Sequence, residues 1–202
     1  MKPSDFDLEY QNQNIESKIV VALERISQSF RSLLWQESTE SSLSPIQIQF
    51  LIFLLHHSKE KRKVSYLAQE FNLSKATVSE TIKLLIEKKL AYKTNAPNDS
   101  RSFIISLTDY GRKVAKDTST FSSEINNPID LLTEKDKEVM LLSLLNIIKH
   151  LNQTGVISIQ RMCWTCEYYR NLKNQQHFCN LLNQELTPTE LRIDCPEHLL
   201  TP

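Results

Sequence analysis

The chain has 202 residues, of which 40% are hydrophobic and 24% charged, a composition typical of a globular protein with its own core. It has only two glycines, Gly111 and Gly155, which excludes a glycine-rich phosphate-binding loop. No apolar run approaches the roughly 20 residues of a membrane span, and the first residues lack the apolar stretch of a secretion signal. We therefore expect a cytoplasmic protein without membrane contact.

The basic and acidic residues cancel overall but are segregated along the chain. Residues 59–113 carry twelve lysines and arginines against six carboxylates, a local charge of +6, whereas the segments on both sides are acidic. A basic segment of this kind is typical of a module that binds a polyanion. A solvated basic face that binds nothing would carry the same charge, so the motifs within the segment must distinguish between these two interpretations.

Helical periodicity begins near the N-terminus. Apolar residues recur every three or four positions from Ile15 to Leu33, which predicts an amphipathic helix. Ser44 is followed by Pro45 and, three positions after the serine, by Gln47, a sequence typical of a capped helix start. The second predicted helix runs from Ile46 to Leu55.

A helix-turn-helix is predicted within the basic segment. A short helix around Ala68 ends at Asn72, a residue that tolerates the left-handed backbone of a sharp turn. Ser74 then caps a second helix, whose inner face consists of Val78, Ile82 and Leu85. The predicted outer face presents hydroxyls and cations suited to base edges and phosphates: Lys75, Thr77, Ser79, Thr81 and Lys83. Two packed helices that do not bind DNA are the alternative.

A basic hairpin is predicted directly after this helix. Residues 91–94 and 102–107 have the pattern of strands, and residues 95–101 are rich in turn-forming Asn, Pro and Asp. A hairpin in this position is typical of a winged helix, whose wing brings a cation to the minor groove of DNA.

In the order of these motifs the chain resembles the MarR family of bacterial transcriptional regulators, roughly over residues 13–152. The resemblance is carried by Leu67-Ala68, residues 73–79, Leu90, residues 99–102 and residues 107–112. Two positions depart from the family pattern. Glu80 stands where a basic residue is common, and Lys89 replaces a glycine that usually precedes the first wing strand.

The resemblance implies roles for the wing and a mode of assembly. Arg101 would enter the minor groove while Asp99 holds it in position, and the protein would dimerise through its terminal helices on a pseudo-palindromic operator. The full set of predicted DNA contacts is Ser74, Lys75, Thr77, Ser79, Thr81, Lys83, Lys93, Asn98, Asp99 and Arg101.

Two further helices are predicted after the wing. Thr108 caps one that runs towards residues 126–128, and Thr133 opens another from Glu134 to about Leu151. Residues 139–148 are apolar around most of the helix, which indicates more than one partner surface. The family resemblance favours a dimer core that contains Leu145 and Ile148; a helix central to its own chain is the alternative.

All four cysteines lie in the last fifty residues, outside the resemblance. Their spacing is Cys163-x2-Cys166-x12-Cys179-x15-Cys195, in which one close pair and two distant cysteines suit a tetrahedral metal site. A cytoplasmic chain seldom holds such a cluster as disulfides. Zinc is the expected cofactor, with an iron–sulfur cluster on the same ligands as the alternative. Four buried structural cysteines, or a ligand role for His177 or His198, also stay open.

The predicted fold is mainly α with a small β wing. Residues 1–152 form a winged helix-turn-helix flanked by dimerisation helices, and residues 153–202 form a Cys-rich metal-binding module that opens with a short extended segment at 156–159. We predict a sequence-specific DNA-binding regulator, a homodimer without enzymatic activity, whose further partner is a small-molecule effector. The alternative is a thiol, redox or iron–sulfur sensor in which Cys163-x2-Cys166 is the active element. A thioredoxin-type enzyme would need a βαβ unit before this pair, which the sequence lacks; an adaptor that contacts only proteins is the third possibility.

Overall fold

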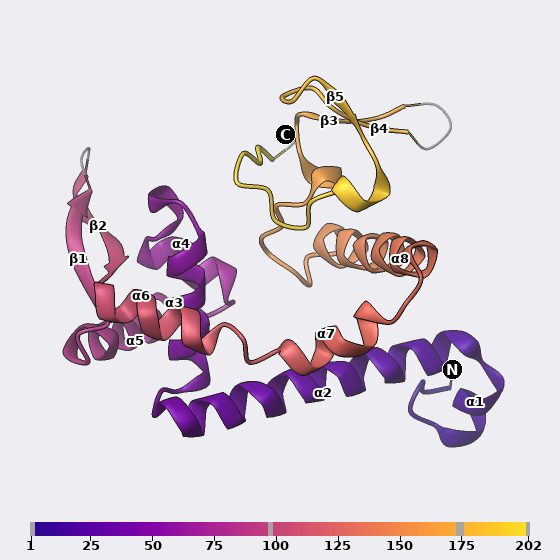
Figure 1. Ribbon diagram of the computed structural model, residues 1–202, viewed down its shortest axis with the longest axis horizontal. Coiled ribbons are helices and arrows are strands. Elements are labelled where there is room, and N and C mark those ends of the chain that lie inside the picture. Colours follow the sequence, from indigo (N-terminus) through magenta and orange to yellow (C-terminus); the bar gives the residue numbers. More distant parts are fainter. Residues whose placement is uncertain (1–2, 97–98, 173–175, 201–202) are drawn as a thin grey trace.

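The computed structural model describes residues 3–96, 99–172 and 176–200, and Figure 1 shows their arrangement. A winged helix lies at one end of the molecule, the long helix α2 runs along one edge, and a small C-terminal module lies above helix α8. Within the described ranges no helix is long and apolar enough to cross a membrane. The predicted class, mainly α with a small β wing, is confirmed.

The helices and the wing follow one another in the predicted order. The part of the chain before the wing contains α1 (Leu8–Gln13), α2 (Ile15–Ser41), α3 (Pro45–His56), a 3₁₀ turn at Lys59–Lys61, α4 (Val64–Glu70) and α5 (Lys75–Glu87). The wing is an antiparallel pair of β1 (Ala91–Ala96) and β2 (Asp99–Leu107). Helices α6 (Asp109–Thr118), α7 (Ser123–Asp130) and α8 (Glu134–Gln153) come after it. Helix α1 had no counterpart among the predicted elements.

The C-terminal module is built from very short elements. It consists of the 3₁₀ helix η2 (Cys163–Thr165), the antiparallel strands β3 (Tyr169–Asn171), β4 (His177–Cys179) and β5 (Gln184–Leu186), and the 3₁₀ helix η4 (Pro188–Glu190). Residues 156–159 were predicted to be extended; instead, residues 156–158 form bends and residue 159 has no regular structure.

The predicted helix caps are confirmed. Ser44 and Gln47 form a reciprocal capping box at the start of α3. At three other helix starts a hydroxyl accepts the backbone N–H three residues later: Ser74 from Thr77 (3.0 Å), Thr108 from Gly111 (2.9 Å) and Thr133 from Asp136 (3.2 Å). Each bond satisfies a donor that the first helical turn leaves unpaired, which fixes where the helix begins.

Two turns require the left-handed backbone that the sequence predicted. Asn72, between α4 and α5, has φ 51°, and Lys89, just before the wing, has φ 59°. Lys89 therefore takes a conformation that favours glycine, at a modest cost in strain.

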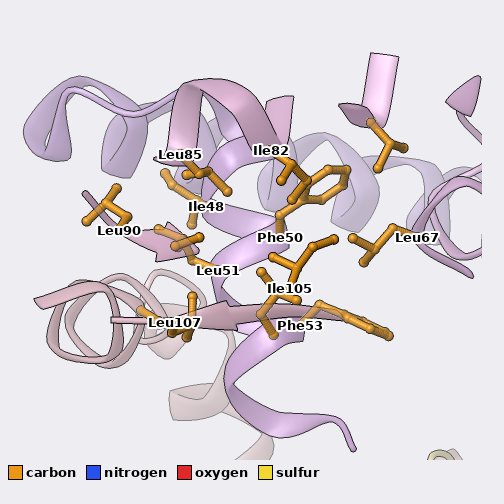
Figure 2. Close-up of a cluster of buried hydrophobic side chains, with 14 of the residues drawn as sticks. Ile48, Phe50, Leu51, Phe53, Leu67, Ile82, Leu85, Leu90, Ile105 and Leu107 are labelled. Atoms are coloured by element: carbon orange, nitrogen blue, oxygen red, sulfur yellow. The ribbon is translucent and has the colours of Figure 1, made fainter. Parts of the chain in front are cut away.

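Helix α3 lies at the centre of the main hydrophobic core. Figure 2 shows its Ile48, Phe50 and Leu51 surrounded by side chains from α4, α5 and the wing. The residues that surround α3 and are at most 3% exposed include Leu67, Val78, Ile82, Leu85, Leu90, Ile105 and Leu107. Because the inner faces of α4 and α5 and the base of the wing share this core, their relative positions are fixed by packing.

Gly111 allows α6 to pack directly on the chain that enters the wing. A Cβ atom at this position would lie 1.8 Å from the carbonyl oxygen of Leu90, a backbone atom that cannot move aside. We expect Gly111→Ala to destabilise the protein by about 1–3 kcal/mol, as over-packing does in a close-packed core. Urea denaturation checks this; Gly155→Ala, which meets no atom within 4 Å but has φ 77°, gives for comparison the cost of left-handed backbone strain without a steric clash. Equal stability of Gly111→Ala and wild type would contradict the expectation.

A second hydrophobic core joins α8 to the C-terminal module. Leu145 of α8, 1% exposed, is buried with Met162, Leu186 and Leu191 of the module, and Leu141, Leu142 and Ile148 pack against them. The assignment of Leu145 and Ile148 to the dimer core is therefore wrong, because the chain's own module covers this face. The core also spans the predicted boundary at residue 152.

The helix predicted after Thr108 is divided into α6 and α7. Between them the hydroxyls of Ser119 and Thr120 donate to the carbonyl oxygens of Lys116 (2.7 Å) and Asp117 (3.0 Å). Such local bonds compete with helical hydrogen bonds and favour a break at this point.

Candidate DNA-binding face and cysteine module

The second helix of the helix-turn-helix, α5, has one face in the core and one face in solvent. Val78, Ile82 and Leu85 are fully buried. The predicted contacts Ser74, Lys75, Thr77, Ser79 and Lys83 are all exposed. The Lys83 ammonium lies 4.0 Å from the Glu80 carboxylate and 3.9 Å from that of Glu87, so two carboxylates offset its positive charge. The hydroxyls and the remaining cation, Lys75, lie on the open first turns of the helix.

Thr81 does not belong to the outer face. Its side chain is buried, with 6% of the residue exposed, and its hydroxyl donates to the carbonyl oxygen of Thr77 (2.9 Å). The prediction that Thr81 contacts DNA is therefore wrong for this conformation, because both its surface and its hydrogen-bonding capacity are used within the protein.

The wing positions one predicted cation in the described part of the chain. Lys93 is exposed on β1 opposite Ile105 of β2, with its ammonium 5.9 Å from the centre of the Phe103 ring. The backbone of Asp99 and Arg101 lies in β2. Their side chains and all of Asn98 lie outside the described residues, so their predicted contacts stay predictions.

The base of the wing is attached to the turn before α4. The backbone N–H of Ile105 donates to the carbonyl oxygen of Arg62 (2.9 Å), and the Arg62 guanidinium donates to the carbonyl oxygen of His57 (2.7 Å). Burial, and next the neighbouring charge of Arg112, lower the pKa of Arg62. This arrangement ties the orientation of the wing to α3 and to the helix-turn-helix.

The four cysteines of the C-terminal module are free thiols, and Cys163, Cys179 and Cys195 line one cavity. Cys166 is buried and the other three are partly buried. Burial raises the pKa of the Cys163 thiol, and negative charge on Cys195, Cys166 or Cys179 raises it further, whereas the Arg192 backbone N–H lowers it. In the described residues, however, no three His, Cys, Asp or Glu side chains form a ready-made metal-binding group.

The two histidines of the module have partners within the protein. His177 is buried, and its Nδ1 lies 2.6 Å from the Tyr169 hydroxyl. The Nε2 atom of His198 lies 3.0 Å from the Thr165 hydroxyl. Burial lowers the pKa of both imidazoles. These contacts explain the two side chains without a ligand role.

A buried arginine, which sequence analysis did not single out, joins the module to the helix-turn-helix. Arg161 is 8% exposed and forms ion pairs with Glu70 of α4 (Nη1–Oε2, 2.6 Å) and with Asp194 of the module (Nη2–Oδ2, 2.9 Å). Its guanidinium also donates to the Tyr66 hydroxyl of α4 (2.9 Å). His57, at the end of α3, lies 2.8 Å from the same Asp194 carboxylate.

The charges in this cluster are balanced by specific contacts. Burial alone would disfavour the charged forms, but hydrogen bonds and opposite charges outweigh it: they raise the pKa of Arg161 and hold the pKa of Asp194 well below its usual range. The guanidinium carbon also lies 6.0 Å from the ring centres of both Phe53 and Tyr66. The result is a charged contact between two parts of the fold that fixes α4 against the module.

No local sequence signal could have revealed this cluster. Arg161 is 91 residues from Glu70 and 33 residues from Asp194, and His57 is 137 residues from Asp194. The pairing of His57, at the end of α3, with Asp194 likewise joins residues that no sequence motif connects.

Comparison with known proteins identifies relatives of the winged helix. Residues 41–102 match the model of the MarR family. The HTH-type transcriptional regulator TcaR of Staphylococcus aureus (strain Newman) is 36% identical over 98 residues, which cover 46% of this chain and 63% of that protein. The chain thus matches less than two thirds of the length of this regulator.

Several solved structures share the fold. The S. aureus MepR structure in a DNA-binding conformation has a TM-score of 0.58 at 22% identity, covering 66% of this chain and 98% of MepR. The S. aureus MepR–DNA complex has a TM-score of 0.56 at 24% identity, covering 65% and 97%. A MarR transcriptional regulator from Methanosarcina mazei Go1 has a TM-score of 0.57 at 17% identity, covering 67% and 97%. At these identities the similarity is one of fold alone.

Proposed function

We propose that this chain, whose residues 41–102 match the model of the MarR family, is a sequence-specific DNA-binding transcriptional regulator that acts as a homodimer. The observation that carries the proposal is the open face of α5. A helix held by three fully buried side chains presents Lys75, Thr77 and Ser79 to solvent. Short hydroxyls and a long cation on the first turns of such a helix suit base edges and phosphates.

The surface formed by α2, α7 and α8 supports the homodimer. Large apolar side chains are exposed there, including Ile26 and Phe30 of α2 and Met140 of α8. An open cavity of about 850 Å³ lies between the three helices and is lined mainly by Leu, Ile, Phe and Met. A contiguous apolar surface of this kind indicates an interaction site. We propose that a second copy of the chain covers it, as the family resemblance implies.

The C-terminal module supplies the modulating element of the proposal. It contacts the helix-turn-helix through Arg161 and Glu70, and through a hydrogen bond from the Ser158 hydroxyl to the carbonyl oxygen of Gln69 (2.8 Å). Both contacts are to α4, the helix that packs against α5. A change in the module can therefore alter the position or rigidity of α5.

The function is tested by binding to DNA that carries the promoter of the protein's own gene. We expect Arg101→Ala to weaken binding to specific and unrelated DNA alike, because a wing cation contributes electrostatic attraction rather than base readout. The dependence of log Kd on log salt should flatten by about one unit for a lost phosphate contact. Mobility-shift titrations at several salt concentrations measure both.

Ser79→Ala is the matched comparison on the recognition helix. It removes one exposed hydroxyl and leaves the charge unchanged, so the salt dependence should stay that of wild type. For a direct base contact, the preference for operator over unrelated DNA should fall by about 1–3 kcal/mol. Unchanged affinity, salt dependence and preference in both variants would place the DNA interface elsewhere.

A further inference from the structure

The first two cysteines lie at the two ends of one tight turn. The 3₁₀ helix η2 begins at Cys163, and the backbone N–H of Cys166 donates to the Cys163 carbonyl oxygen (2.9 Å). A closed turn with two cysteines three residues apart is the usual way in which one loop supplies two sulfur ligands to a single metal ion. Neither thiol is used in a disulfide.

The fold brings the other two cysteines to this turn. Tyr169 donates its backbone N–H to the Cys166 carbonyl oxygen (3.0 Å) and is paired with Cys179 across β3 and β4. On the other side, Cys163 donates to the carbonyl oxygen of Arg192 (3.0 Å), three residues before Cys195. Cys163, Cys179 and Cys195 line one cavity of about 360 Å³. Backbone hydrogen bonds thus hold distant cysteines around one space.

Donors near the sulfurs suit thiolate ligands. The Arg192 backbone N–H lies 3.2 Å from Cys163 Sγ, and the Arg192 guanidinium lies 3.6 Å from Cys195 Sγ. Hydrogen bonds from the surrounding shell stabilise the negative charge that thiolates bring to a metal. One residue therefore supports two of the four sulfurs.

The module has little else to stabilise it. Its core contains three buried apolar residues, Met162, Leu186 and Leu191, and depends on Leu145 of α8 for a fourth. Its three described strands have three residues each. Small folds with so thin a core usually need a metal or disulfides, and the four cysteines here are free thiols.

We propose that Cys163, Cys166, Cys179 and Cys195 bind one Zn²⁺ ion as four thiolates, and that Arg161 links this site to DNA binding. Since the sulfurs do not already form a metal-binding group, binding would turn them inward on a backbone that is already in place. Zinc is the usual ion of a closed structural site of four thiolates, and it would supply folding energy to a module whose core is thin.

The link to the helix-turn-helix follows from the chain next to the last ligand. Cys195 donates its backbone N–H to the Arg161 carbonyl oxygen (3.0 Å), and the preceding residue, Asp194, forms an ion pair with the Arg161 side chain. Arg161 in turn holds Glu70 of α4. Zinc at Cys195 would therefore fix the segment that holds Arg161 against α4. Only this linkage rests on the proposed DNA-binding function.

The zinc site is tested on the full chain purified without chelator and without oxygen. Elemental analysis should give one zinc per chain, and the four thiols should react with a thiol reagent only after a chelator is added. Each of the four Cys→Ser variants should lose the metal. Glu197→Gln, an exposed residue on the same cavity, should keep it. Where a serine variant fails to fold, replacing zinc by Cd²⁺ in the wild type should give the ultraviolet sulfur-to-metal absorption of a thiolate site.

The linkage is tested separately by DNA binding. Removal of zinc should change operator affinity by roughly fivefold or more, and operator DNA should change zinc affinity by the same factor. Arg161→Met should bind zinc but lose this dependence.

Two results would overturn the zinc site: iron with visible absorption in place of zinc, or a metal-free protein whose four thiols react freely. Zinc bound with unchanged operator affinity would overturn the linkage alone. Absence of DNA binding in every metal state would contradict the proposed function, while the zinc stoichiometry would still stand as its own result.

Discussion

Phe30→Asp is expected to convert the protein into a folded monomer that binds its operator roughly 10²–10⁴-fold more weakly. This is the factor by which the affinity of two linked binding sites exceeds that of one site alone. Phe30 lies on α2, is 41% exposed in the single chain and lines the apolar cavity between α2, α7 and α8. A carboxylate there remains hydrated in the monomer, so the fold should survive. In the dimer it would be buried without a partner, at a cost of several kcal/mol.

The control for this variant lies on the same helix. Gln28→Asp introduces the same charge at an exposed position that does not line the cavity. Analytical ultracentrifugation should show a dimer for wild type and Gln28→Asp, and a monomer with unchanged helix content for Phe30→Asp. If Phe30→Asp stays dimeric at micromolar concentration, the two copies meet on another surface.

Arg161→Met is expected to destabilise the protein by about 2–3 kcal/mol. Removing one partner of a buried ion pair costs about 3–5 kcal/mol because the remaining charge is left unpaired. We expect less than this range because the Asp194 side chain is 42% exposed, so that water partly screens its charge. Methionine keeps much of the apolar stem, so the loss reports the charge contacts to Glu70 and Asp194 rather than a cavity.

Urea denaturation and limited proteolysis measure the effect of Arg161→Met. Arg170→Met is the matched control, since among the described residues that guanidinium donates to the backbone carbonyl oxygens of Glu167 (2.7 Å) and Tyr169 (2.9 Å) at the surface and to no side chain. New cleavage should appear after residue 153 in Arg161→Met alone. Glu70→Gln should lower the free energy of unfolding by less in the Arg161→Met variant than in wild type, because the two residues interact. Equal stability of the two arginine variants would contradict a structural role for the cluster.

Local signals allowed most of the winged helix to be predicted. The caps at Ser44, Ser74 and Thr108 and the left-handed turns at Asn72 and Lys89 depend on a few neighbouring residues, and all of them are present. These features depend on backbone chemistry that acts over one or two helical turns.

Residues at the edge between the buried and the exposed face of a helix were harder to predict. Thr81 lies one residue before Ile82 and three after Val78, at the edge of the buried face of α5. Helical periodicity alone does not assign such a position, and an intrahelical bond to the Thr77 carbonyl oxygen allows the hydroxyl to be buried. The apolar circumference of α8 indicated more than one partner surface, but only the folded chain shows which face its own module covers.

Long-range pairings could not be predicted from a single sequence. The Arg161 cluster joins α3, α4 and two separate segments of the module, and nothing near Arg161 in the sequence distinguishes it from Arg170. A charge becomes a structural element only when the fold removes it from water, and that depends on all the elements that surround it.

The position of α8 between two neighbours has a practical consequence for shortened forms of this protein. Cutting the chain after residue 152, where the sequence motifs suggest a boundary, would leave Leu141, Leu142, Leu145 and Ile148 without the side chains that cover them. Such a fragment would expose an apolar face of α8 that the module normally covers, and it would tend to aggregate. Studies of the isolated winged helix would therefore need polar replacements at those four leucine and isoleucine positions, and a regulator that lost the module in evolution would need the same changes.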